Sequence, residues 1–255
     1  MKSAALRLLQ RARLLGPVYR AYERLLALRG RRPVTAADGL PVPPPELIVR
    51  VAGTADARWF LEGGRLGFES IRERIPVEKL GAVLDFGCGC GRVTRYWLGV
   101  GPAVTGTDLS DAAVDWCRRN LPFARFEPNG LAPPLPFEDE SFDLVYALSV
   151  FTHLPEELQL LWVRELARVL RPGGRLLLTT HGDRYRGRLD AAERARYDAG
   201  EVVVRWEDVA GSNLCAAFHP PSWVRGRLAG ELEHVEFAPE GAKGNPHQDV
   251  HVFRK

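Results

Sequence analysis

The sequence is poor in cysteine, and its cysteines do not have the spacing of a metal site. Cys88, Cys90, Cys117 and Cys215 are the four cysteines among 255 residues, and no two of them form a Cys-x-x-Cys pair. Isolated cysteines of this kind are mostly small buried thiols in a reducing compartment. We therefore expect a cytoplasmic protein with no disulfide framework and no metal.

Long apolar runs are also missing. No stretch of 18 apolar residues occurs, so we expect no membrane-spanning helix, and no internal repeat or low-complexity tract interrupts the chain. The apolar content of 45% and the charged content of 26% are typical of globular proteins. A chain of 255 residues suits one α/β domain with a short appendage.

Acidic residues are scarce at the start of the chain. Residues 1–32 contain nine Lys and Arg but one acid, a local charge of +8, whereas the remainder has 26 basic and 31 acidic residues, a local charge of −5. Arginines interrupt the apolar residues of this segment, which is unlike a secretory signal. We expect a basic helical arm with a linker over residues 1–40, followed by one domain over 41–255.

The arm has an amphipathic pattern. Gly16-Pro17 divides it into two expected helices, and the second has an apolar face. That face consists of Val18, Tyr19, Tyr22, Leu25 and Leu26. Three interpretations stay open: the face packs on the domain, the arm covers an acceptor site, or it contacts anionic lipid or a lipid-linked substrate.

The most informative segment is a glycine-rich turn after a short apolar run. Residues 82–84 (AVL) precede 85–92 (DFGCGCGR), which predicts a buried parallel strand that ends in the carboxylate of Asp85. Glycine here allows left-handed or closely packed backbone where a Cβ would block a ligand. The dinucleotide fingerprint needs G-x-G-x-x-G, and Arg92 stands where its third glycine falls. The turn therefore suits a cofactor that has an adenosine but no pyrophosphate.

The following segments repeat a strand–helix alternation. A second strand, 103–107, leads to Asp108, whose carboxylate at this position can accept hydrogen bonds from both ribose hydroxyls. Further expected strands end near residue 131 and cover 142–147, 175–180, 232–237 and 249–253. Expected helices cover 46–75, 92–98, 110–120, 155–169 and 222–228, and Trp59, Phe60 and Phe68 in the first of them are available to cover the cofactor pocket. Within residues 184–218 we expect a β-rich insertion with strands at 201–206 and 214–218.

Four motifs in this order give a family resemblance. D-x-G-x-G-x-G, T-G-x-D, L-P-F-x-x-x-S-F-D and L-R-P-G-G make the chain resemble the class I S-adenosylmethionine-dependent methyltransferases, particularly those that act on small molecules. The motifs cover residues 80–180, and a looser likeness continues beyond them. The resemblance implies an α/β Rossmann-like, doubly wound, seven-stranded sheet, mostly parallel with strand seven antiparallel, and S-adenosylmethionine as the cofactor.

The resemblance also implies a set of cofactor contacts. Asp85 is expected near the amino group of the methionine moiety, Asp108 at the ribose, and Asn129 at the adenine amine, where many relatives have aspartate. An amide oxygen can accept the same hydrogen bond. The expected cofactor-binding residues are Asp85, Phe86, Gly87, Gly89, Gly91, Asp108, Leu109, Asn129, Gly130, Ala147 and Leu148.

Two classes of nucleic-acid methyltransferase are not expected. Residues 147–150 read Ala-Leu-Ser-Val, without the Asn-Pro-Pro-aromatic segment of enzymes that methylate nucleobase amines. A Pro-Cys nucleophile for cytosine C5 chemistry is also missing. We expect a small-molecule acceptor rather than a nucleic acid.

Three histidines are candidate catalytic bases. His153, His181 and His219 fall at the C-terminal edge of the expected sheet, where such sheets bind ligands. A hydroxyl acceptor must lose its proton, and histidine titrates near neutral pH. We rank the candidates in the order His219, His181, His153. The expected reaction is methylation of a hydroxyl on a sugar, glycan or natural product, with residues 184–218 as a substrate cover.

Two other functions stay open. An RNA or protein methyltransferase would grip its substrate with the basic arm, although the catalytic portion is net acidic. A catalytically silent cofactor-binding subunit would bind S-adenosylmethionine without turnover.

Overall fold

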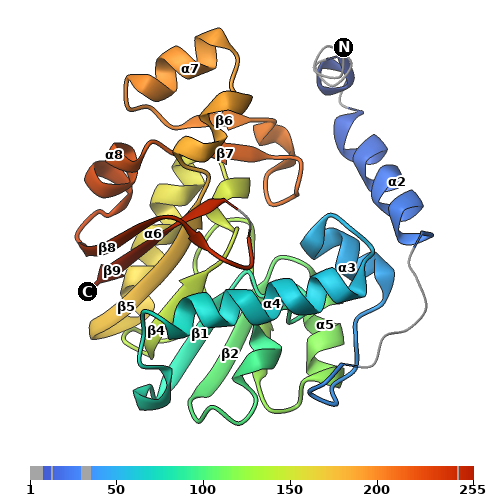
Figure 1. Ribbon diagram of the computed structural model, residues 1–255, viewed down its shortest axis with the longest axis vertical. Helices are drawn as coiled ribbons and strands as arrows, with labels where there is room; N and C mark the ends of the chain where they lie inside the picture. Colours follow the sequence, from blue (N-terminus) through green and yellow to red (C-terminus); the bar gives the residue numbers. More distant parts are fainter. Residues whose placement is uncertain (1–7, 13, 30–35, 246) are drawn as a thin grey trace.

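One mixed sheet of seven strands organises the described part of the chain. The computed structural model describes residues 8–12, 14–29, 36–245 and 247–255, and the sheet has the strand order β3-β2-β1-β4-β5-β9-β8 (Figure 1). The strands are β1 Ala82–Phe86, β2 Ala103–Asp108, β3 Arg125–Pro128, β4 Phe142–Ala147, β5 Leu170–Thr180, β8 Glu233–Ala242 and β9 Gln248–Arg254. A separate antiparallel pair consists of β6 Val203–Arg205 and β7 Ala216–Phe218.

The direction of the strands agrees with the expected topology. β1 is parallel to β2 and β4, β2 is parallel to β3, and β4 is parallel to β5. β9 is antiparallel to both β5 and β8. The expectation of a doubly wound α/β sheet with an antiparallel last strand is confirmed. In residues 184–218, β6 and β7 lie within the two expected strand ranges but have three residues each, and the same segment contains a helix, Ala191–Asp198, that the sequence did not predict.

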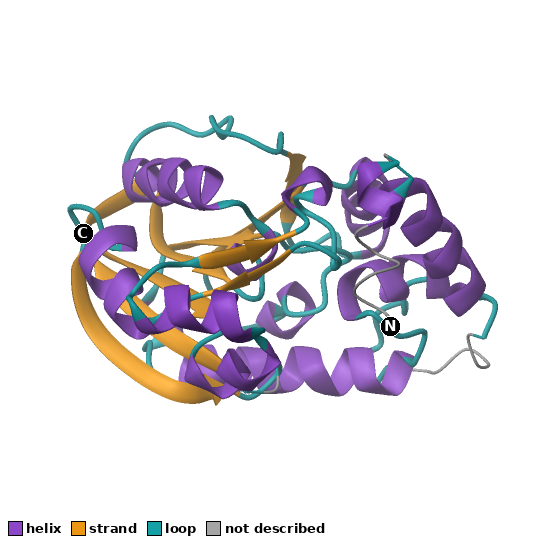
Figure 2. Cartoon of the chain, turned by 90° about the horizontal axis from the view of Figure 1, so that it is seen from above, coloured by secondary structure: helices purple, strands orange, loops and turns teal. Residues whose placement is uncertain are grey.

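Helices lie on both faces of the sheet (Figure 2). The helices are α2 Leu15–Ala27, α3 Pro45–Ala52, α4 Ala57–Arg72, α5 Asp111–Asn120, α6 Glu156–Val169, α7 Ala191–Asp198 and α8 Pro221–Trp223, which continues as a π-helix over Val224–Leu228. None of the helices in the described ranges is long and apolar enough to cross a membrane.

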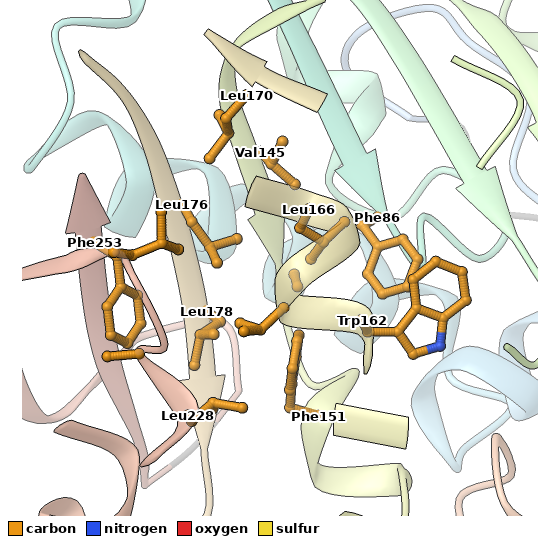
Figure 3. Close-up of a cluster of buried hydrophobic side chains, with 14 of the residues drawn as sticks. Phe86, Val145, Phe151, Trp162, Leu166, Leu170, Leu176, Leu178, Leu228 and Phe253 are labelled. Atoms are coloured by element: carbon orange, nitrogen blue, oxygen red, sulfur yellow. The ribbon is translucent and has the colours of Figure 1, made fainter. Parts of the chain in front are cut away.

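Alternation along the central strands produces two apolar layers. Leu84, Val145 and Leu178 belong to a buried cluster with α6, whereas Val83 and Leu144 belong to a cluster with α4. Successive side chains of a strand point to opposite faces, so each central strand contributes to both layers. Figure 3 shows the α6 layer, which extends to Phe86 and Trp162 at the C-terminal end of β1.

The predicted helix 92–98 is wrong. The segment forms turns and a 3-10 helix, Thr94–Trp97, because its polar side chains bond to distant partners. Thr94 donates from Oγ1 to the Asp85 carboxylate at 2.6 Å, and the Arg95 guanidinium donates to Asp38 at 2.6 Å. These tertiary bonds hold the backbone in a tighter turn than an α-helix.

Two other boundaries also differ from the sequence expectation. β5 begins at Leu170 rather than 175, because Leu170 pairs with Phe142 before the register shift. Residues 8–11 are helical and α2 begins at Leu15, so the division between the two expected arm helices lies before Gly16-Pro17 rather than at it. Proline is accepted in the first turn of α2 because its missing amide has no helical partner there. Residues 1–7, 13 and 30–35 of the predicted arm lie outside the described residues. Part of the first predicted arm helix falls on these residues.

Candidate functional site

A cavity of about 230 Å³ opens at the C-terminal ends of β1, β2 and β4. This is the edge where open α/β sheets bind ligands. Its walls come from the glycine turn (85–89, 92 and 93), the end of β2 (108–110 and 113), the loop 129–131, and the segment after β4 (148–150, 153 and 154). Leu47, Arg50 and Val51 of α3, Trp162 of α6, and Gly211 and Asn213 of the insertion complete it.

The glycine turn depends on left-handed backbone. Gly87, Gly89 and Gly91 have φ angles of 77°, 54° and 74°, which other residues rarely adopt. A Cβ on Gly87 would lie 2.4 Å from a methyl of Val150, and one on Gly89 would lie 2.5 Å from a methyl of Val51. We expected a Cβ at these glycines to clash with a bound ligand. The structure shows that it would instead clash with the side chains of Val150 and Val51.

The two acids at the strand ends are fixed by hydrogen bonds. Asp108 accepts from the backbone amides of Gly89 and Ser110, both at 2.8 Å, one on each carboxylate oxygen. Asp85 accepts from Thr94 and is 4% exposed. Burial raises the pKa of Asp108 and raises the pKa of Asp85 to about 6, because a charged carboxylate is less well solvated there.

Asn129 has an unsatisfied acceptor at the cavity. Its side-chain nitrogen donates to the Gly130 carbonyl at 2.7 Å. Its Oδ1 is buried and has no hydrogen-bond partner among the described residues. Buried polar atoms are nearly always hydrogen-bonded, so an unpartnered acceptor in a cavity wall indicates a missing donor.

His153 is the one predicted base candidate that lines the cavity among the described residues. Its Nδ1 lies 2.7 Å from the carbonyl oxygen of Cys215. Because a carbonyl can only accept, Nδ1 carries the proton and Nε2 keeps its lone pair. Burial lowers the pKa of His153, so the ring is neutral near pH 7.

His181 lies behind His153, with the ring centroids 6.5 Å apart. Its Nδ1 donates to the Ala217 carbonyl at 3.1 Å, and its Nε2 accepts from the Gln248 amide at 3.3 Å. Burial, with a smaller contribution from His153, lowers the pKa of His181 to about 3. Both nitrogens are thus engaged, and His181 does not line the cavity.

His219 lies farther inside the protein. It is 0% exposed, its Nε2 donates to Gln159 at 2.9 Å, and burial lowers its pKa well below the usual value. The placement therefore reverses our ranking of His219, His181 and His153. Among the described residues, no cluster of three or more His, Cys, Asp or Glu side chains can hold a metal ion.

The central part of the chain matches a known family. Residues 84–178 match the family model described as "Methyltransferase domain". The chain carries a class I S-adenosylmethionine-dependent methyltransferase domain. Its cofactor is S-adenosylmethionine, as the motifs implied.

Two curated relatives of this methyltransferase domain are O-methyltransferases. The tocopherol O-methyltransferase of Arabidopsis thaliana chloroplasts is 30% identical over 168 residues, covering 62% of this chain and 44% of the relative. The malonyl-[acyl-carrier protein] O-methyltransferase of Enterobacter lignolyticus is 34% identical over 116 residues, covering 46% of this chain and 45% of the relative. The chain thus spans less than half the length of these relatives.

Solved structures share the fold. The crystal structure of an S-adenosylmethionine-dependent methyltransferase from Methanosarcina mazei covers 72% of this chain and 96% of that chain, with a TM-score of 0.54 and 24% sequence identity. At this identity the likeness concerns the fold alone.

Most residues expected at the cofactor line the cavity of the methyltransferase domain. Gly91 and Ala147 do not: a Cβ on Gly91 would meet Leu121, and Ala147 is 0% exposed in the α6 layer. The expected residues that line the cavity are Asp85, Phe86, Gly87, Gly89, Asp108, Leu109, Asn129, Gly130 and Leu148.

Sequence reasoning missed the wall that α3 contributes. We expected Trp59, Phe60 and Phe68 to be available as a cover, but Phe60 and Phe68 are buried in the core and Trp59 lies beside the Arg92 guanidinium. Residues 46–75 were expected to be one helical segment, which the structure divides into α3 and α4. The helical pattern holds no signal for the cavity. Contact with Val51 becomes visible only once α3 is packed over Gly89.

Proposed function

We propose that this protein transfers a methyl group from S-adenosylmethionine to a hydroxyl group of a small molecule, either a sugar or glycan or a natural product. The methyltransferase domain and its O-methyltransferase relatives support the reaction class. Because the chain spans less than half of those relatives, the acceptor is argued from the cavity. The observation that carries the proposal is the position of His153.

The cofactor end of the cavity has groups that match S-adenosylmethionine. The unpartnered Oδ1 of Asn129 is an acceptor for the adenine amine. Asp108 keeps free lone pairs on both oxygens for the ribose hydroxyls, although each oxygen already accepts one backbone amide. Asp85 offers negative charge for the amino group of the methionine moiety. These residues fit the cofactor.

His153 is the proposed base at the acceptor end. The Cys215 carbonyl fixes the imidazole tautomer, so Nε2 is the atom that accepts the hydroxyl proton. S-adenosylmethionine, when bound, supplies a methyl group activated by its sulfonium. The new O–CH₃ bond forms as the S–CH₃ bond breaks, and the proton of the acceptor stays on His153 until solvent removes it. The remaining task of the chain is to align the reactants and exclude water.

Residues 184–218 are proposed as the substrate cover. Asn213 donates to the Arg50 carbonyl at 2.7 Å, which joins the insertion to α3 across the cavity rim. The amide of Gly211 donates to the His153 carbonyl at 2.8 Å. The segment that supplies an acceptor wall thus also holds the proposed base. We accordingly treat residues 1–40 as an arm and 41–255 as the methyltransferase domain.

The test is turnover of S-adenosylmethionine with a panel of hydroxyl acceptors. His153→Ala should lower kcat by roughly 10²–10⁴-fold with S-adenosylhomocysteine affinity unchanged, because a general base contributes that much. The pKa of His153 is lower than the ordinary histidine value of about 6.5, so the ring stays neutral at pH 7 and above. The wild-type rate should therefore be constant from pH 8 to 7 and decrease only at pH values below about 6.5.

His247→Ala is the matched control, because His247 is an exposed histidine that pairs with Glu240 outside the cavity. Equal rates for both variants would reject His153 as the base. Cofactor binding without turnover on any acceptor would reject the catalytic proposal and favour a silent subunit.

A further inference from the structure

Much of the apolar face of α2 is open to solvent. Five side chains, here named the α2 stripe, are between 45% and 81% exposed. They follow one another at intervals of three or four residues, so they share one side of the helix. The α2 stripe consists of Leu14, Val18, Tyr22, Leu25 and Leu28.

The predicted packing face of the arm is therefore divided. Leu15 and Ala27 are buried, and Tyr19 and Leu26 are half-buried, so one side of α2 packs on the domain. The neighbouring side holds the stripe. Of the twelve large apolar side chains that are exposed among the described residues, six lie between residues 8 and 28. Single exposed apolar residues are ordinary, but a continuous patch marks an interaction surface.

Positive charge surrounds the stripe. Arg11, Arg20, Arg24 and Arg29 are all exposed. At 100° per residue, Arg24 projects about 40° beyond Leu28 at one edge of the stripe. Arg20 lies about 40° further round, between Arg24 and the buried Ala27. Residues 1–32 as a whole have a charge of +8. An apolar stripe with flanking arginines and an aromatic residue is the pattern of a helix that lies in the headgroup layer of an anionic membrane.

We propose that the α2 stripe docks on an anionic lipid surface. The charge complementarity selects this partner, because a second copy of this chain would bring two equally cationic arms together. Docking needs no methyl transfer and goes beyond the proposed function.

Docking would also place the cavity near the lipid. α2 lies beside α3 at the edge of the molecule (Figure 1), and α3 lines the cavity. Gln10 donates to Asp208 at 2.9 Å, three residues before the cavity-lining Gly211. If the proposed function holds, a hydroxyl acceptor anchored in the membrane is the favoured substrate class.

The experiment is co-sedimentation of the full chain with vesicles of phosphatidylcholine, alone or mixed with phosphatidylglycerol. We expect the protein to bind the mixed vesicles but not the pure phosphatidylcholine vesicles, and to bind more weakly as the salt concentration rises. Arg20→Ala and Arg24→Ala should each lower the partition coefficient about fivefold, because one basic residue near such a surface contributes about 1 kcal/mol. The double variant Val18→Ser/Leu25→Ser should lower the partition coefficient more than either arginine variant does.

Leu161→Ser is the matched control, because Leu161 is 44% exposed on α6, away from the stripe. It should bind vesicles like the wild type. Calorimetry with S-adenosylhomocysteine checks that each variant is folded, and it reports on the cofactor site separately from docking. The proposal would be overturned if the stripe and arginine variants bind vesicles as strongly as the wild type. It would also be overturned if the wild type does not bind vesicles and light scattering shows a wild-type dimer that the Val18→Ser/Leu25→Ser variant does not form.

Discussion

At the scale of single residues, Asn129 combines an unpartnered polar atom with a position at the cavity. Thr107 and Asn129 both have a buried side-chain oxygen with no partner among the described residues, but Asn129 alone of the two lines the cavity. Its position after β3 made it predictable from the sequence as the adenine contact. Its unsatisfied state was not predictable, because this depends on the loop conformation that turns Nδ2 toward Gly130.

Asn129→Ala should weaken S-adenosylhomocysteine binding by about 0.5–1.5 kcal/mol, the net contribution of one hydrogen bond. The unliganded protein should melt close to the wild type, because the change removes both a buried acceptor that lacks a partner and the hydrogen bond from Asn129 to the Gly130 carbonyl, two effects of opposite sign. Calorimetry and thermal melting measure the two effects. Asn120→Ala, which removes a bond to the Trp116 carbonyl outside the cavity, is the control and should leave affinity unchanged.

Asp85 should make cofactor binding depend on pH. Burial raises its pKa to about 6 from the ordinary 3.8, so the free protein takes up a proton as pH falls through 6. A protonated Asp85 loses its attraction for a cationic amino group. S-adenosylhomocysteine affinity should therefore be constant from pH 8 to 7 and fall below pH 6, by at most about tenfold per pH unit.

Calorimetry across this pH range measures the effect, with Asp85→Asn as the comparison. The variant should bind more weakly at pH 8 and show a smaller loss at low pH. An identical pH profile for both proteins would show that another group titrates.

At the scale of elements, the sequence predicted those parts whose local pattern agrees with their packing. β1, β4 and α6 combine apolar periodicity with motifs at their ends, and the structure places them close to the expected ranges. The 94–97 turn and the entry of α3 into the cavity depend on contacts with residues far away in the chain. Local periodicity holds no information on such contacts, so these two features were mispredicted or missed.

The packing of α4 on the glycine turn gives a prediction at this scale. A Cβ on Gly64 would lie 1.9 Å from the Arg92 carbonyl oxygen, a backbone atom that cannot rotate away. Gly64→Ala should destabilise the protein by about 1–3 kcal/mol or more in urea unfolding, because α4 must move off the turn. Gly187→Ala, with no atom within 4 Å of the added carbon, should change stability by less than about 0.5 kcal/mol.

At the scale of the whole molecule, the arm and the insertion are joined to the same cavity. α2 packs on α3, and α3 is bonded to the insertion through Asn213. The sequence showed the charge difference between the arm and the domain, because charge counts need no structure. It did not show that the apolar face of α2 is divided between packing and solvent, because this depends on how α2 is rotated against α3.

The partners of Arg92 have a consequence for the order of events during folding. Arg92 is 6% exposed and donates to the Gly244 carbonyl and the Asn245 side chain, 152 and 153 residues later in the chain. A buried guanidinium without partners is strongly unfavourable. Arg92 therefore reaches its final environment only after residues 244 and 245 have docked beside it, whereas the glycine turn itself is bonded to β2 through Gly89 and Asp108. We expect the pairing of β1 with β2 to form before the last part of the cavity wall, the side chain of Arg92, becomes fixed.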